Sequence, residues 1–382
     1  MSKKLLHTPE GVRDIYGLEY ERKLVVEENL QKIISSYGYH GVQTPTFEFF
    51  DVFSKEIGTT PSKELYKFFD KEGNTLVLRP DFTPSIARCA AKYFMEENYP
   101  IRFCYSGNTF TNTSNLQGKL KEVTQMGAEL INDGSVEADA EMISMVIEAL
   151  KYVGLRKFHV SIGQVEYFKG LCEEAGLDEE TENDLREYIS GKNFFATQEL
   201  LKERNVKEPY AEIILKVADI FGNMTSLSEA RNLVTNKRSL DAIDRLEKLY
   251  EVLKLYGAEK YVSFDLGMLS KYHYYTGIIF KVYTYGIGDA LVKGGRYDNL
   301  LNQFGKKASA VGFVIVIDDL LEALSRQRVV VHSETRSCVI EYNSRDYAQK
   351  LGEAIALRKT GVAVELIPEN NQADAEGNNK NE

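Results

Sequence analysis

Tryptophan is absent from this chain of 382 residues, and cysteine, histidine and proline are scarce, at 4, 5 and 8 residues. The four cysteines lie far apart, and none belongs to a CxxC pair (Cys89, Cys104, Cys172 and Cys338). This spacing predicts neither a disulfide framework nor a cysteine-based zinc site, and reduced thiols are the natural interpretation. The histidines do not cluster at metal-ligand spacing, so we expect no metal and no cofactor.

Long apolar runs are also missing. No run of about 18 apolar residues occurs, so the sequence predicts no membrane span. The first residues hold no apolar stretch of signal-peptide length, and we expect a cytoplasmic protein. Lys and Arg number 47 against 57 Asp and Glu, which gives a net charge of −10. An acidic chain is a poor candidate for non-specific nucleic-acid binding, because phosphate contacts need a basic face.

The residues that are present define a mixed pattern of helices and strands. Apolar spacing over residues 19–37 predicts a helix, and Pro45 then begins an extended segment. The turn residues Gly73 and Asn74 predict a hairpin over residues 68–79. Two more helices are predicted over residues 83–94 and 136–152, and two strands over residues 101–110 and 121–131.

The character of the chain changes at about residue 167. From there to about residue 260 the sequence is dense in Glu, Lys, Leu and Ala, which predicts a helical insertion. Strand character then resumes and ends in a buried strand and a helix. These later strands are predicted over residues 262–266, 278–285, 289–293 and 311–317, and the helix over residues 318–326.

A polar joint near His332 precedes a last strand-helix-strand unit, predicted over residues 338–340, 344–360 and 362–367. We therefore expect a main domain over residues 1–328, a β-α-β unit over residues 333–368 and a disordered tail over residues 369–382. Strands and helices do not alternate regularly. The order predicts an α+β fold with an antiparallel sheet flanked by helices, rather than a doubly wound parallel sheet.

Seven stretches, in one order, carry a resemblance to a known family. They cover most of residues 8–325 and read TPEGVRDIYG, YGYHGVQTPTFE, LRPDFTPSIAR, SGNTF…QMGAEL, YYTGIIF, KGGRYDNLL and VGFVIVIDDLLEAL. Together they resemble histidyl-tRNA synthetase. The resemblance implies the class II aminoacyl-tRNA synthetase fold, usually dimeric.

Three arginines of that family are missing. The positions that match its two ATP-binding arginines hold Thr111 and Asp319, and the arginine near its RGLDYY motif is matched by Ser270. Arginine suits such sites because its planar, permanently charged fork binds phosphate oxygens in pairs. Losing both ATP contacts removes much of the electrostatic clamping that adenylation needs. The sequence therefore predicts no catalytic residue.

The histidine-binding positions of the family are mostly kept. The resemblance assigns this role to Asp81, Phe82, Thr83, Gln125, Glu129, Tyr274 and Tyr275. Simpler roles stay open at several of them. Asp81 precedes a helix and has the position of a cap, while Tyr274 and Tyr275 point to opposite faces if they lie on a strand. The glycines of GGRYDNL allow either a close approach to a ligand or a tight turn, and Arg296 has Asp298 as a candidate partner.

This pattern, with only about fifty residues in place of a complete anticodon-binding domain, is similar to the family of ATP phosphoribosyltransferase regulatory subunits. The resemblance implies a non-catalytic chain in the first step of histidine biosynthesis. Its partner would be the short-form ATP phosphoribosyltransferase catalytic subunit, its effector L-histidine, and self-dimerisation and no tRNA binding are expected. A divergent histidyl-tRNA synthetase and a synthetase-derived RNA-binding protein are the alternatives. The sequence leaves open the stoichiometry and the place where histidine binds.

Overall fold

The computed structural model describes residues 6–53, 60–113, 120–269, 274–331 and 337–369. The chain forms two compact units, Met1–Val331 and His332–Glu382. The tail predicted to be disordered lies outside the described residues from position 370 onward, as do Ser270 and His332. No helix of the described ranges has both the length and the apolar character needed to cross a membrane.

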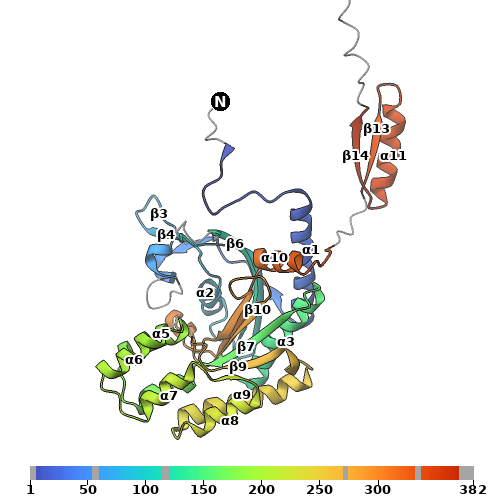
Figure 1. The fold of residues 1–382 in the computed structure, drawn as a ribbon. Coiled ribbons are helices and arrows are strands. Elements are labelled where there is room, and N and C mark those ends of the chain that lie inside the picture. Colours follow the sequence, from blue (N-terminus) through green and yellow to red (C-terminus); the bar gives the residue numbers. More distant parts are fainter. Residues whose placement is uncertain (1–5, 54–59, 114–119, 270–273, 332–336, 370–382) are drawn as a thin grey trace, which may run out of the picture. The chain divides into compact units, whose positions relative to one another are not determined.

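The first unit is built on a large sheet (Figure 1), in which nine strands can be followed through the described residues. Most neighbouring strands pair antiparallel. The exceptions are the end pair β1 with β5 and the pair β7 with β9 near the other end, which are parallel, while β8 pairs antiparallel with β9 at that edge. The predicted α+β class is confirmed, and the sheet is mixed at its two ends. In spatial order the strands are β1 (His40–Gly41), β5 (Ile101–Phe110), β6 (Glu122–Ile131), β12 (Ala310–Val316), β11 (Val292–Arg296), β10 (Ile278–Thr284), β7 (Phe158–Gln164), β9 (Val262–Asp265) and β8 (Phe221–Gly222).

Four helices outside the insertion belong to this unit: α1 (Gly17–Ser36), α2 (Thr83–Tyr93), α3 (Val136–Tyr152) and α10 (Ile317–Arg326). In α1 the buried positions recur at helical spacing, at Val26, Leu30, Ile33 and Ile34, so one stripe of the helix faces the core. The Ser135 side chain begins α3 by accepting a hydrogen bond from the Ala138 amide, which satisfies one of the free amides of the first turn. All four helices were predicted, within two residues at each end.

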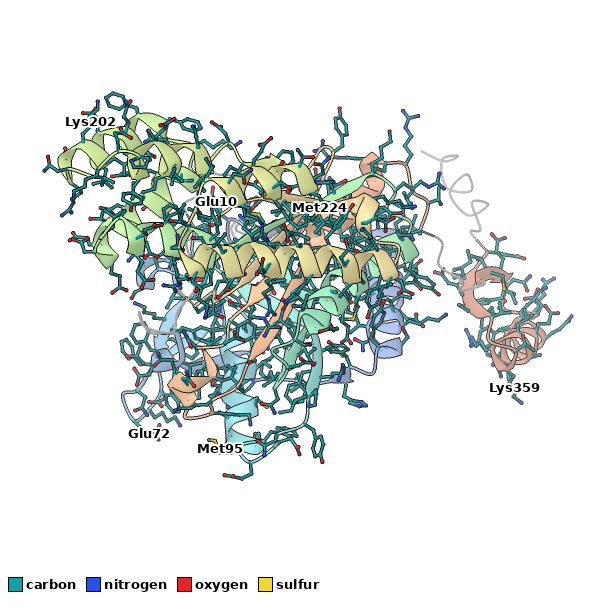
Figure 2. All side chains as sticks on the ribbon, turned by 90° about the horizontal axis from the view of Figure 1, so that it is seen from below. Glu10, Glu72, Met95, Lys202, Met224 and Lys359 are labelled. Carbon is teal, nitrogen blue, oxygen red and sulfur yellow. The ribbon has the colours of Figure 1, made fainter. Side chains whose placement is uncertain are left out.

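The predicted helical insertion holds six helices within the described residues: α4 (Val165–Glu174), α5 (Glu179–Ser190), α6 (Phe194–Glu203), α7 (Tyr210–Val217), α8 (Met224–Asn232) and α9 (Lys237–Leu255). Asp178, Asn193, Asn223 and Asn236 cap four of them through side-chain oxygens. Helix α9 packs against α4 and α3. In Figure 2 its side chains line one face of the molecule, and Lys202 of α6 marks the outer end of the insertion.

Four strands of the large sheet differ from the sequence prediction. Strands β1, β7 and β8 were not predicted. Strand β11 begins at Val292 rather than at Asp289, so Gly294 and Gly295 lie inside a strand and not in a turn. A Cβ atom at Gly294 would clash with the Phe280 ring, and one at Gly295 would clash with the Tyr275 ring, so both positions need the absence of a side chain.

A small second sheet, β2 (Phe47–Phe49), β4 (Thr75–Leu78) and β3 (Lys67–Phe69), contains the predicted hairpin. Gly73 turns it with a φ of 86°, in the left-handed region that glycine tolerates. Short 3-10 helices are η2 (Phe50–Phe53), η3 (Ser62–Glu64), η5 (Glu259–Tyr261) and η6 (Leu301–Phe304). In the second unit, β13 (Ser337–Tyr342) and β14 (Ala363–Pro368) are parallel and joined by α11 (Tyr347–Lys359), which is the predicted β-α-β unit.

Candidate functional site

A cleft of about 1600 Å³ lies on one face of the sheet, over β6, β11 and β12. Its walls come from the segment before α1, the start of α2, the start of α10 and the residues after α10. Five of the seven predicted histidine-binding residues line it: Asp81, Thr83, Gln125, Glu129 and Tyr274. Residues from distant parts of the sequence therefore share one cavity, which is the ordinary form of a small-molecule site.

Glu129 lies at the floor of this cleft and is 1% exposed. The Thr83 hydroxyl donates to its Oε1 at 2.9 Å, and the Tyr297 hydroxyl donates to its Oε2 at 2.6 Å. Burial raises the pKa of Glu129 to about 8, against the lowering effect of these two donors, and the nearby Asp81 carboxylate raises it further. Glu129 is therefore mostly protonated at neutral pH and offers one hydrogen-bond donor as well as acceptors.

Asp81 and Thr83 come from the turn that leads into α2. The Thr83 amide donates to Asp81 Oδ1 at 3.0 Å, so Asp81 satisfies the first amide of α2 although the N-cap position is Phe82. Asp81 also lines the cleft. Gln125 lies on β6 four residues before Glu129, and the even separation places both on the same face of the sheet. The carboxylate, hydroxyl and amide groups form a polar wall suited to the charged and polar groups of an amino acid.

Phe82 and Tyr275 do not line the cleft. Phe82 is 1% exposed, stacks on Tyr105 with 4.4 Å between ring centroids, and carries the Arg79 guanidinium 4.0 Å from its ring centroid. Tyr275 packs against Val165, Met268 and Ile279. The structure therefore does not place these two side chains in the cleft: Phe82 is buried in the core, and the half-buried Tyr275 packs on another apolar cluster.

At the other end of the cleft, Thr111 and Asp319 lie where the family resemblance predicts ATP contacts. Asp318 and Asp319 occupy the first turn of α10, whose free amides otherwise favour an anion. Burial and the neighbouring carboxylates of Asp289 and Asp318 raise the pKa of Asp319. Negative charge has taken the place where a synthetase would hold phosphate.

The charges that line the cleft differ between its two ends. Of the described residues that line the whole cleft, seven are acidic and five are basic, but two of the acidic ones, Asp81 and Glu129, belong to the polar end. Three of the basic ones are already paired: Arg13 with Glu19 at 2.5 Å, Lys293 with Asp289 at 3.0 Å and Arg326 with Glu322 at 2.5 Å. The far end therefore has acidic and basic residues in equal number, and it lacks arginine at the two positions, 111 and 319, where the family resemblance places one.

Tyr297 lines the cleft but was not predicted, although it lies in the GGRYDNL stretch of the family resemblance. Tyr105 is buried behind the cleft, next to Glu129, and no sequence signal marked it. Burial and the Glu129 carboxyl raise the pKa of both hydroxyls well above their usual range. Arg296 is structural: it donates to Asp139 at 2.6 Å and to Asp298 at 3.1 Å.

In the described part of the chain, no group of three or more His, Cys, Asp or Glu side chains is arranged to hold a metal ion. The site is a cleft with a polar end around Glu129 and a far end that has Thr111 and Asp319 in place of the family's two arginines.

The fold and this cleft define the class of protein as a histidyl-tRNA synthetase-like domain. The sequence profile of the histidyl-tRNA synthetase family matches residues 11–320. The crystal structure of histidyl-tRNA synthetase from Nostoc sp. PCC 7120 is 19% identical and shares the fold, with a TM-score of 0.80 over 96% of this chain and 87% of that one.

More similar proteins narrow the class. A relative from Acetivibrio thermocellus is 41% identical over 96% of this chain and 88% of its own length, and carries the name ATP phosphoribosyltransferase regulatory subunit. A relative of the same name from Ruminiclostridium cellulolyticum is 39% identical, with the same coverage. A solved ATP phosphoribosyltransferase regulatory subunit/histidyl-tRNA synthetase from Bacillus halodurans C is 34% identical, with a TM-score of 0.87 over 97% of this chain and 94% of that one. The chain belongs to the family of ATP phosphoribosyltransferase regulatory subunits.

Proposed function

We propose that this chain is a non-catalytic subunit that a short-form ATP phosphoribosyltransferase catalytic subunit requires for activity in the first step of histidine biosynthesis. We also propose that histidine inhibits the complex by binding in the cleft. The observation that carries the proposal is the contrast between the two ends of one cavity. The polar groups around Glu129 can take an amino acid, whereas the far end has Thr111 and Asp319 in place of the two arginines that would pair with the phosphates of a nucleotide.

The imidazole of histidine fits the polar end chemically. Its two ring nitrogens need one donor and one acceptor when the ring is neutral. Protonated Glu129 and the Tyr297 hydroxyl offer both kinds of group within 2.6 Å of each other. Asp81 is an acid that can pair with the α-ammonium group, and Gln125 adds an amide on the same wall.

Inhibition through this chain requires that histidine bind one state of the complex better than another. Coupling energies of this kind are typically about 1–3 kcal/mol, or roughly 5- to 150-fold in affinity. The chain would enter the complex together with the catalytic subunit and with a second copy of itself.

A mixing experiment tests the proposal. This chain and the short catalytic chain of the same organism are purified, and phosphoribosyl-ATP formation is assayed with each alone, with both, and with both plus histidine. We expect activity only in the mixture and a fall with histidine. A short chain that is equally active and equally inhibited alone would refute the proposal, and RNA binding and adenylation would then be tested.

The histidine site is tested within the same assay by Gln125→Ala and Glu129→Ala. We expect weaker inhibition with assembly unchanged, as measured by sedimentation of the mixture. Glu212→Ala on α7 is the control, because this carboxylate is exposed and pairs only with Lys216 in the described structure. Unchanged inhibition in both cleft variants would discard the site and leave the subunit role standing.

A further inference from the structure

Glycine occupies a position of the sheet that the Glu129 side chain covers. Gly312 of β12 is paired with Glu129 of β6 in the sheet register. A Cβ atom at Gly312 would overlap the Oε2 and Cδ atoms of Glu129. The carboxyl group therefore lies across the neighbouring strand, in space that exists only because residue 312 has no side chain.

This space matters because of what the carboxyl group reaches from it. From this place Oε1 meets the Thr83 hydroxyl and Oε2 meets the Tyr297 hydroxyl. Thr83 begins α2 and Tyr297 directly follows β11, so three separate elements converge on one carboxyl group. If a side chain at position 312 pushed the Glu129 carboxyl group off β12, the group would lose the Thr83 and Tyr297 hydroxyl donors and move toward the open cleft.

We propose that Gly312 is a positioning residue for ligand recognition, because its missing side chain holds the Glu129 carboxyl group at the floor of the cleft, where it meets the ring of an imidazole-bearing amino acid. The inference rests on the proposed function and adds a residue that touches no ligand itself. Its effect runs through Glu129, so it must vanish when Glu129 is removed.

The test compares Gly312→Ala with Gly163→Ala in the full chain. Gly163 of β7 is the matched control, because a Cβ there would come within 2.8 Å of the Met268 carbonyl oxygen and within 3.0 Å of the Asp265 carbonyl oxygen. Both variants crowd a strand of the same sheet, but only Gly312→Ala displaces Glu129. Histidine affinity is measured by calorimetry, and the free energy of unfolding is measured from pH 5 to 8.

In the unchanged chain, stability falls as pH rises through this range, since folded Glu129 keeps its proton up to a pKa of about 8 while the unfolded chain loses it near 4.5. We expect Gly312→Ala to flatten this slope, because a displaced carboxyl group ionises near its ordinary pKa. Histidine affinity should fall at least tenfold. Gly163→Ala should keep the slope and an affinity within about twofold of the unchanged chain.

A Gly312→Ala variant that keeps both the slope and the affinity overturns the inference. If Gly312→Ala does not fold, the double variant Glu129→Ala with Gly312→Ala is tested. Removal of the carboxyl group should then restore folding, and a double variant that does not fold would overturn the inference too. If the unchanged chain binds no histidine, the proposed effector is wrong, while the pH slopes still show whether Gly312 positions Glu129.

Discussion

Glu129 binds its proton differently in the folded and the unfolded chain. Its pKa is about 8 when folded, against an ordinary value of 4.5, chiefly because the folded protein buries it. Between these two values the folded state holds more protons than the unfolded state, so stability decreases as pH rises. The decrease is about 1.4 kcal/mol per pH unit at most.

Glu129→Gln tests this linkage. The amide cannot ionise, so we expect the free energy of unfolding to become nearly independent of pH between about 5 and 8, apart from other groups. The variant should match the unchanged chain near pH 5 and be several kcal/mol more stable at pH 8. Denaturant titration at a series of pH values measures the effect, and parallel curves for the two proteins would contradict it.

Thr111 and Asp319 are the two residues because of which we expect no adenylation. Substituting Arg at both positions replaces one hydroxyl and one carboxylate by two guanidinium groups at the far end of the cleft. We expect ATP to bind roughly tenfold or more tightly than to the unchanged chain, because arginine pairs with phosphate oxygens. Fluorescent ATP titration measures this change, with Glu212→Arg on α7 as the control for added positive charge.

The unchanged chain should show no ATP–pyrophosphate exchange with histidine. Exchange at a synthetase-like rate would restore the alternative of a working synthetase.

At the scale of elements, a buried ion-pair cluster joins the helical insertion to the sheet. Asp139 of α3 is fully buried and is bound by Arg296 of β11 and by Arg245 of α9, each at 2.6 Å. Arg296 immediately precedes Tyr297, so the cluster also fixes the strand end that carries a donor to Glu129. Breaking such a pair from one side leaves a buried charge uncompensated.

We expect Arg296→Gln to destabilise the protein by about 3–5 kcal/mol, in line with the loss of a buried partner. Arg245→Gln should destabilise it less, since the Arg245 side chain is 24% exposed, against 3% for Arg296. Arg231→Gln is the control, because its partners Asp244 and Glu247 are 50% and 34% exposed and such pairs contribute at most about 1 kcal/mol. Equal losses in all three variants would contradict the role of the cluster.

Most elements followed from local pattern, and β7 and β11 are among the exceptions. Strand β7 is largely buried and pairs on both sides, with β10 and β9. Its sequence, FHVSIGQ, alternates apolar and other residues in the way that a strand does, so the signal for β7 was present in the sequence and was missed. Strand β11 was predicted to end before its two glycines, which left a close approach and a tight turn equally open. Only the aromatic rings of Phe280 and Tyr275, packed against Gly294 and Gly295, show why the strand has glycine there.

At the scale of the whole molecule, the cleft belongs to one unit. Every residue that lines it lies at or before Val331. A chain that ends at Val331 should therefore bind histidine with an affinity within about threefold of the full chain. Calorimetry on both proteins checks this, with thermal unfolding as the control for folding. Loss of binding in a folded, shortened chain would show that the second unit takes part in the site.

The sequence by itself determined the family, the order of the elements and the two replaced arginine positions, because ordered motifs and apolar spacing are local properties of the chain. Tertiary structure alone decided which predicted side chains face the ligand cavity. Phe82 and Thr83 are neighbours, yet one stacks in the core and the other donates to Glu129. Only the packing of α2 on the sheet separates them.

The same holds for the proton on Glu129. Its carboxyl group has an ordinary pKa in the sequence and an altered one in the fold, since burial over Gly312 removes the water that would stabilise its charge. Residues 183 positions apart along the chain create that environment together. A sequence lists such groups, but the free energy of ionising them depends on what the folded chain places around them.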